Sequence, residues 1–550
     1  MMMKNLNRFM AFAATAMMLF SCGSDDNITP GESGVADGSS VKATMGQLAA
    51  DGDVFPSSEP STRTTLGDQN EIKWVKGDSI SISYGTDNRR FNVSTISEDG
   101  TSCTFAGTPL GDNQNATRYV AVYPYSMKTT FSGNTVSGVT LPYVQNAVAG
   151  GFDPACNLMT ASAAVGSNLQ FKHVCSYFKV KPAFDCAGIT ITATNGEKLA
   201  GTFDVTVAED GTPSVSDITS ESNQVKLVGD IKAGETYYIA VLPGTYSSGI
   251  KVLLEKNARK LSGKDKAFDW TNSTLTLSSY SRSASTSIST SSAKIKSLGS
   301  LTETNTTIST KTIEFVDLGY GDDISEEHGK KVLWAKCNLG ANSETEYGDY
   351  YAWGETKTKP KETFTLDNYL CKDYYPETLD EAHDAAAANL GYGWHMATPD
   401  ELVEMKENCI FAMKGSSFYA YPMTTVKGEP VKDVQLYGSG LYRYKTGFGS
   451  AATHTPITDE DVVNSVKQIA QENSEPHLCF PAAGSWPEGA STCRYWLNGH
   501  GTQPLYVNDR VGGELAAYYL GMWSGGFNTL SRAYPRHVGM PVRPVLEVEW

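Results

Sequence analysis

Short runs of alternating apolar and polar residues dominate the chain from residue 42 to residue 278. In "EIKWVKGDSISISY" (71–84), Ile80 and Ile82 fall on one face of an extended chain, and the serines between them fall on the other. The stretches "RYVAVYPYS", "YFKVKPAF", "YYIAVLPGTY" and "GIKVLLEK" follow the same pattern, and Gly, Asn, Asp and Pro separate the runs. Many short strands with regular turn signals predict all-β sandwiches in this half of the chain.

Helical patterns occur only in the last part of the chain, residues 311–550. Thr398 is a predicted helix N-cap, Pro399 suits the first helical position, and Glu401 completes a capping box. A similar Thr-x-x-Glu signal precedes "AHDAAAANLG", and residues 455–473 form a third candidate helix. The rest is rich in Gly, Tyr and Trp, with seven of the nine tryptophans, which predicts an α+β domain with long loops.

Two segments have the composition of connections. Residues 22–41 are rich in Gly, Ser and Asp and predict a flexible tether. Residues 279–310 are rich in Ser and Thr and poor in aromatics, which predicts a linker between the β-rich half and the C-terminal domain.

The N-terminus has the pattern of an export signal. A basic head with Lys4 and Arg8 precedes an apolar run over 9–20, which is too short to span a bilayer. Leu19-Phe20-Ser21-Cys22 resembles a bacterial lipobox, which implies a signal peptide over 1–21 and lipid attachment at Cys22. The paired aspartates 25 and 26 resemble the acidic tag of surface-exported lipoproteins of Bacteroidetes. The expected location is therefore the outer membrane, facing outward, with the lipid as the only membrane contact.

Composition narrows the classes of partner. The formal net charge of −16 and the absence of a basic stripe argue against nucleic acid and against anionic membrane surfaces. Nine cysteines remain after Cys22, an odd number that leaves at least one free thiol or an intermolecular bond, with one or two disulfides open. No pair has CxxC spacing, and no His/Cys cluster has zinc-like spacing, so no metal and no cofactor are expected.

Five separated strings in the β-rich half resemble one family. They are Arg63-Thr64-Thr65-Leu66 with Trp74 and Gly77-Asp78, then Tyr119–Ser126, "LPYVQNAVAGGFDPACNLMTASA", "LQFKHVCSYFKVK" and "YYIAVLPGTY". In this order they resemble fimbrillins, the Mfa-like type V pilus subunits of Bacteroidetes. The resemblance implies two transthyretin-like sandwiches, over 42–165 and 166–278. It also implies polymerisation with other pilus subunits by donor-strand exchange, after an arginine-specific protease trims the N-terminus. Arg63 is a candidate cleavage site, although it also fits as an ordinary part of the fold motif.

A second set of strings covers nearly all of 311–546. "VLWAKCNLGA", "YGDYYAWGET", "GWHMATPDELVEM", "LCFPAAGSW" and "RHVGMPVRPV" resemble C-type-lectin-like domains of the formylglycine-generating-enzyme type. The oxidases with this fold use two reactive cysteines close together, whereas Cys479 and Cys493 are far apart in sequence and lack a clearly basic neighbourhood. No Ser/His/Asp set can be assembled either, so no catalytic residue is assigned and no enzyme is expected.

A calcium-dependent sugar site is also not expected. Gln503-Pro504 and Asn508-Asp509 are similar to lectin motifs, but they are compressed into one short segment. Leu505 stands where a carboxylate ligand is needed, and calcium requires such hard oxygen ligands.

The stretch 497–540 is the predicted recognition surface. Fixed-looking scaffold strings there bracket irregular patches rich in Tyr, Trp, Arg, Asn and His, residue types that suit recognition, although any one aromatic residue could belong to the core. The candidate ligand-binding or variable residues are Leu497, Asn498, His500, Gln503, Tyr506, Asn508, Arg510, Trp523, Phe527, Asn528, Arg532, Tyr534, Arg536 and His537. This layout also resembles the targets of diversity-generating retroelements.

Together the two halves indicate a cell-surface or pilus-tip adhesin whose C-terminal domain binds an extracellular protein or glycan. Three alternatives remain open from the sequence. One is a static surface lipoprotein with a fixed lectin-like binder. Another is a structural fimbrial subunit whose C-terminal domain is a spacer. The last is a surface oxidase or hydrolase, which turnover dependent on Cys479 or Cys493 would indicate.

Overall fold

The computed structural model describes fourteen stretches of the chain. They are residues 40–55, 72–83, 86–108, 117–319, 330–372, 378–437, 440–444, 454–472, 476–485, 493–498, 510–511, 514–523, 526–528 and 533–549. Cys22, Arg63, His500, Gln503, Tyr506, Asn508 and Arg532 lie outside them. Within these stretches the chain is mostly β-sheet with few helices, and no helix is long and apolar enough to cross a membrane.

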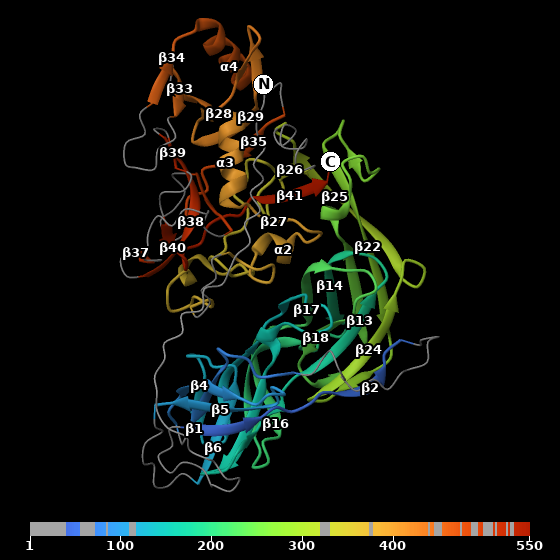
Figure 1. The fold of residues 1–550 in the computed structure, drawn as a ribbon. Helices are drawn as coiled ribbons and strands as arrows, with labels where there is room; N and C mark the ends of the chain where they lie inside the picture. Colours follow the sequence, from blue (N-terminus) through green and yellow to red (C-terminus); the bar gives the residue numbers. More distant parts are fainter. Residues whose placement is uncertain are drawn as a thin grey trace, which may run out of the picture.

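The first unit is one curled sheet at the bottom of Figure 1. Its order is β11 (Leu169–Gln170), β1 (Ser40–Thr44), β5 (Ser102–Gly107), β4 (Arg89–Ile96), β3 (Ser79–Ser83), β6 (Arg118–Tyr123), β10 (Met159–Ala164) and β12 (Lys172–His173). The two edge strands are separated in the chain by Phe171 alone, so the sheet bends until its edges meet. Trp74 fills the centre, with its ring 5.1 Å from that of Phe105 and 5.5 Å from that of Phe171. The predicted sandwich is therefore one sheet folded on itself.

The second unit packs several sheets around the largest apolar core. One is β18 (Tyr237–Val241), β13 (Ser176–Pro182), β24 (Lys294–Leu301) and β2 (Ala49–Asp53); another is β16 (Pro213–Ser222), β15 (Ala200–Val207), β8 (Thr135–Leu141) and β7 (Thr130–Ser132). Two short strands pair beside them, β19 (Gly244–Tyr246) and β23 (Ile288–Thr290). Two 3₁₀ turns belong to this unit, η1 (Pro154–Cys156) and η2 (Ala258–Lys260).

A long sheet joins the second unit to the C-terminal module, residues 317–549. Its order is β27 (His395–Met396), β41 (Pro544–Glu549), β26 (Lys330–Ala335), β25 (Thr307–Val316), β22 (Thr274–Ala284), β20 (Ile250–Lys256), β14 (Cys186–Ala193), β17 (Gln224–Ile231) and β9 (Val144–Asn146), with β21 (Phe268–Asp269) beside β22. Figure 1 shows β26 and β41 lying next to β25 at the upper end of the green strands.

The predicted boundary between the sandwiches at 165/166 is wrong in detail. Strand β8 pairs with β15 and β9 pairs with β17 of the second unit, while β7 pairs with β8 and β2 pairs with β24. The chain crosses between the two units several times, because neighbours in these sheets are set by pairing and not by sequence order.

The predicted linker over 279–310 is also wrong. It contains the end of β22, then β23, β24 and the start of β25. Ile295, Leu298 and Leu301 are buried at a spacing of three residues, and the pairing of β24 with β13 shifts register between Ser297 and Ser300. Hydroxyls of the segment pair across strands, as those of Ser279 and Ser309 do at 2.9 Å. Ser and Thr fill the outer face of a half-buried strand as readily as they fill a linker.

The C-terminal module mixes sheets and helices. Its six-stranded sheet has the order β34 (His454–Ile457), β33 (Gly440–Tyr444), β32 (Val434–Tyr437), β28 (Cys409–Lys414), β29 (Ser417–Pro422) and β35 (Leu478–Phe480), with the hairpin β30 (Thr424–Val426) and β31 (Glu429–Val431). A second sheet surrounds β38 (Glu514–Trp523), which pairs with β36 (Cys493–Trp496), β37 (Arg510–Val511), β39 (Gly526–Asn528) and β40 (Ala533–Pro535). The helices are α2 (Ala385–Asn389), α3 (Pro399–Asn408) and α4 (Glu460–Glu472), with the 3₁₀ turn η3 (Lys361–Thr363).

The three predicted helices agree with the structure to different extents. The capping box of α3 is confirmed: Thr398 Oγ1 accepts from the Glu401 N–H at 3.2 Å, and Glu401 Oε2 accepts from the Thr398 N–H at 2.8 Å. Helix α2 begins later than the Thr-x-x-Glu signal, because the cap is Asp384. Only the second part of 455–473 is helical, since its first residues form β34.

Candidate functional site

The described residues of the predicted recognition stretch lie on and around β38. The backbone positions of Arg510, Trp523, Phe527 and Asn528 are on β37, β38 and β39. Because β38 pairs with four other strands, these segments, distant in sequence, are brought to one sheet. The sheet thus brings the backbone of these segments together.

Leu497 and Asn498 are part of the scaffold and not of an open surface. Leu497 is 1% exposed and lies in the apolar core of the module. Asn498 Nδ2 donates to Asp384 Oδ2 at 3.1 Å, and its Oδ1 accepts from the Leu379 N–H at 2.8 Å. The prediction that Leu497 contacts ligand is therefore corrected: its side chain is fully packed inside the module.

Arg536 is likewise corrected, because it is 2% exposed. Its guanidinium lies over the ring of Trp353, 4.4 Å from the centroid, an arrangement that a planar cation favours. Nearby Tyr534 is half-buried and accepts a hydrogen bond from Arg494 Nη1 at 3.0 Å. His537 is also only half-buried, so Tyr534 and His537 remain partly accessible.

Of the two strands that precede Arg63 in the chain, β1 lies inside the first sheet and β2 lies at the edge of another. β1 lies between β5, which it pairs antiparallel, and β11, which it pairs parallel, and it buries Val41 and Ala43. β2 pairs with the outer edge of β24, and all five of its residues are exposed.

Apolar side chains on either side of β2 hold this segment down. Met45 and Leu48 are buried on one side, and Phe55 is buried on the other, with the Arg282 guanidinium 4.3 Å from its ring centroid. Residues 40–55 are therefore an extended segment fixed by separate apolar anchors, with an exposed edge strand between them in which Asp51 Oδ2 lies 3.0 Å from Lys296 Nζ.

The last described strand, β41, is enclosed. It pairs with β26 on one side and with β27 on the other, and Val545, Leu546 and Val548 are buried. Just before it, the buried Arg543 donates to Asn338 Oδ1 at 2.8 Å and to the Cys479 carbonyl at 2.6 Å. This strand is committed to the interior of the module.

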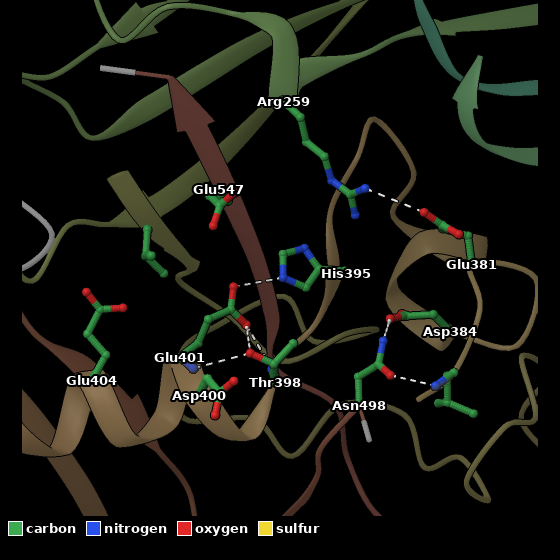
Figure 2. Close-up of a pocket in the computed structure, with 12 residues that line it drawn as sticks. Arg259, Glu381, Asp384, His395, Thr398, Asp400, Glu401, Glu404, Asn498 and Glu547 are labelled. Carbon is green, nitrogen blue, oxygen red and sulfur yellow. Dashed lines mark hydrogen bonds and ion pairs between the residues drawn. The ribbon is translucent and has the colours of Figure 1, made fainter. Parts of the chain in front are cut away.

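A cavity of about 500 Å³ lies where η2 of the second unit meets the module. Its lining residues are Arg259, Val332, Leu379, Glu381, Asp384, His395, Thr398, Asp400, Glu401, Glu404, Asn498 and Glu547. Figure 2 shows Arg259 reaching toward Glu381 from the green ribbon and His395 pointing to Glu401. The sequence indicates Thr398 and Glu401 only as a helix cap. No local pattern links Arg259 to cavity residues that lie more than a hundred positions away in the chain.

Charged groups in this cavity perturb one another. Burial alone would lower the pKa of His395, but the charge of Glu401 and their 2.8 Å hydrogen bond outweigh it and raise the pKa above 6.5. Burial would raise the pKa of Glu401, but His395 outweighs it and lowers the pKa. For Asp384, burial prevails over the hydrogen bonds it accepts from backbone N–H groups, so its pKa is raised. The pair and the Asp384 cap are therefore structural features of the cavity wall.

The described cysteines are poor nucleophiles. All nine are free, and Cys479 and Cys493 are fully buried. Burial raises the pKa of Cys479 and raises that of Cys493 to about 12, the opposite of what a reactive thiolate needs. Among the described residues, no group of His, Cys, Asp and Glu is arranged to hold a metal ion.

Comparison with known proteins gives similar structures but no matching family. No protein-family model matches the chain, and no curated protein matches it. A proposed cell adhesion protein from Bacteroides ovatus is similar at 12% identity and a TM-score of 0.27, over 49% of this chain and 95% of that one.

Two fimbrial proteins are also similar. One is from Bacteroides ovatus, with 12% identity, a TM-score of 0.21, and coverage of 66% of this chain and 76% of that one. The other is the tip fimbrial protein Mfa3 from Porphyromonas gingivalis with C-terminal truncation, with 9% identity, a TM-score of 0.19, and coverage of 44% and 78%. Identities and TM-scores this low do not assign a function to the chain.

Proposed function

We propose that the chain is a surface adhesin of a pilus, a subunit that accepts a donor strand and carries a ligand-binding module at the tip. The observation that carries the proposal is the position of β1 and β2, which both precede Arg63. Cleavage after Arg63 would separate residues 40–55 from the rest of the fold.

Loss of this segment would open one continuous path across two units. It would expose the edges of β5, β11 and β24, together with the sites of Met45, Leu48 and Phe55. Fully burying a Leu, Met or Phe side chain contributes about 1.5–3 kcal/mol, so a donor strand with apolar residues at matching positions would restore most of the lost stability. Strand addition at a sheet edge supplies the backbone hydrogen bonds.

The pairing of the later strands in the described part of the chain supports a tip position. β24 and β25, which complete the second unit, are both paired within the chain, and β41 is enclosed between β26 and β27. A subunit that accepts a strand and keeps its own later strands folded terminates an assembly at the outer end.

The module at that end is proposed to bind an extracellular protein or glycan without chemistry. The proposed ligand contacts are His500, Gln503, Tyr506, Asn508, Arg510, Trp523, Phe527, Asn528, Arg532, Tyr534 and His537. The buried, high-pKa thiols of Cys479 and Cys493 support binding over oxidase chemistry. Many copies on one cell would convert weak contacts into avidity. Variation of these positions by a retroelement, and lipid attachment at Cys22 before assembly, remain part of the proposal.

Two measurements on the parent cells test the proposal. Sheared pili should contain the chain, and Arg63→Ala should remove it from them while leaving it on the cell surface. The triple variant Tyr506→Ala, Trp523→Ala and His537→Ala should abolish adhesion of whole cells to a glycan and host-protein array. A matched triple at exposed positions of β30, β31 and β33, Thr425→Ala, Glu429→Ala and Arg443→Ala, should leave adhesion unchanged. If the Tyr506, Trp523 and His537 triple adheres as well as the control triple does, the binding role is contradicted. If the chain is absent from the sheared pili of the parent cells and of all variants, the tip position is contradicted.

A further inference from the structure

The connection between the second unit and the C-terminal module is a continuous sheet. β25 pairs with β22 from Thr307 to Glu314 and then with β26 through Phe315 and Val316. β26 in turn pairs with β41 along five residues. One strand thus leaves the sandwich and enters the module without any intervening tether.

The two parts also share one apolar core at this joint. On the side of the sandwich it contains Leu275, Leu277 and Ile313, and on the side of the module it contains Leu333, Ala335, Tyr392, Trp394, Leu546 and Val548. Leu277 is 2% exposed, and Leu333, Trp394 and Leu546 are fully buried. Neither part could bury these side chains alone, because each set covers the other.

Three hydrogen bonds to backbone carbonyls cross the joint on one side. The Ala258 N–H donates to the Tyr392 carbonyl at 2.9 Å, and Arg259 Nε donates to the Gly393 carbonyl at 2.6 Å. The Gly263 N–H donates to the Glu549 carbonyl at 2.7 Å. The turn η2 and the loop after it are therefore bonded to β41 and to the segment before β27.

A buried ion pair of the second unit contacts the module on another side of the joint. Lys226 Nζ lies 2.9 Å from Glu255 Oε2 and donates to the Ala388 carbonyl at the end of α2, at 3.1 Å. Gly391 has a φ of +74°, and a Cβ there would stand 2.4 Å from Glu255 Oε2. Both members of the pair belong to the second unit, and the module contributes the Ala388 carbonyl and the closely packed backbone at Gly391.

Contacts of a third kind involve the loops around β9. The hydroxyls of Tyr143 and Thr356 are 2.9 Å apart, and the Ala382 N–H donates to Asn146 Oδ1 at 3.0 Å. Relative motion is the default between domains unless their interface is large and apolar. Here the interface is an apolar core crossed by a hydrogen-bonded sheet.

We propose that the second unit and the C-terminal module unfold as one cooperative unit, with β25 and β26 as the element that joins them rigidly. On the proposed function, a pull on bound ligand would pass from β41 through β26 and β25 directly into the sandwich. The module is then completed by the sandwich, and is not a separable head on a flexible stalk.

Native-state hydrogen exchange on the full chain tests the joint, with no ligand present. Leu277→Ala removes a buried side chain on the sandwich side only. A cooperative unit predicts that amide exchange in β14 and β20 and in β26 and β41 rises by the same factor, about 30-fold or more for a Leu→Ala cavity. If that variant does not fold, Ile313→Val should give an equal rise in the same strands, of about 2- to 10-fold.

The matched control is Ile80→Ala, a fully buried site in the curled sheet, whose core is separate from the joint. It should speed exchange in β3 and β6 and leave β26 and β41 unchanged. Faster exchange in β14 and β20 with unchanged β26 and β41 in Leu277→Ala would overturn the proposal. So would an equal rise in β26 and β41 for Ile80→Ala. Neither result depends on whether the module binds a ligand or the chain joins a pilus.

Discussion

At the scale of residues, the module contains buried charged side chains of types that are usually exposed. Arg536, Arg543 and the His395–Glu401 pair are all largely buried, and each finds an aromatic ring, carbonyls or an opposite charge. Charged residues are seldom fully buried unless they are paired, so the sequence alone favours a surface for Arg536. The ring of Trp353 that receives it comes from a segment nearly two hundred residues earlier, which no local pattern indicates.

Arg536→Ala is expected to lower the free energy of unfolding of the chain by about 2–4 kcal/mol, because it removes a buried side chain stacked on Trp353. Urea unfolding followed by tryptophan fluorescence measures the loss. Arg443→Ala, at an exposed position on β33, is the matched control and should change stability by less than about 0.5 kcal/mol. Native stability combined with lost ligand binding in Arg536→Ala would return this residue to the recognition surface.

The His395–Glu401 pair predicts a pH dependence. Because the folded pKa of His395 is raised, its stabilisation is fully present below the ordinary value of 6.5 and is lost as pH rises through the folded pKa. Because the folded pKa of Glu401 is lowered, its stabilisation is present above the ordinary value of 4.5 and is lost as pH falls through the folded pKa. The pair therefore stabilises the fold most between those two values.

His395→Gln should remove the part of the stability loss that the parent chain shows above pH 6.5, as read from urea midpoints across a pH series. Glu401→Gln should remove the same part, since either change breaks the pair. An unchanged slope above pH 6.5 in both variants would show that this pair does not titrate with folding.

At the scale of elements, alternation and capping could be read from the sequence, whereas pairing could not. Ile80 and Ile82 are buried in β3 as their spacing predicts, and the capping box of α3 starts the helix at the predicted residue. Residues 279–310 have the composition of a linker, yet they contain strands whose apolar residues, such as Tyr280, Ile295 and Leu298, are buried. A polar strand and a polar linker differ only in whether another strand lies beside them, and that neighbour is distant in sequence.

Leu298→Ala tests this assignment directly. Leu298 is fully buried on β24, so the change should cost about 2–5 kcal/mol of unfolding free energy, measured by urea denaturation. Ile308→Ala, at a position 58% exposed on β25, is the control and should cost little. A linker would tolerate both changes equally, and that result would restore the compositional interpretation.

At the scale of the whole molecule, β strands from the N-terminus, the middle and the C-terminus interleave. The first strands complete sheets formed mainly by later residues, and the module shares a core with the second unit. The sequence patterns predict separate domains, but not that β2, β7, β8 and β9 cross a predicted boundary. The recognition stretch was predicted as a position in the sequence, and the structure separates its buried members, Leu497 and Arg536, from Tyr534 and His537, which stay partly accessible.

The most direct test of the account is whether residues 40–55 can be exchanged. The chain should be cut with an arginine-specific protease, separated from its N-terminal fragment in mild denaturant, and titrated with a fluorescent peptide of residues 40–55. The account predicts that cleavage at Arg63 lowers thermal stability, that one peptide binds per chain and restores it, and that a peptide carrying Val41→Lys and Leu48→Lys does not. An Arg63→Ala chain that is trimmed equally, or a trimmed chain that keeps its stability and ignores the peptide, would contradict an acceptor groove for a donor strand.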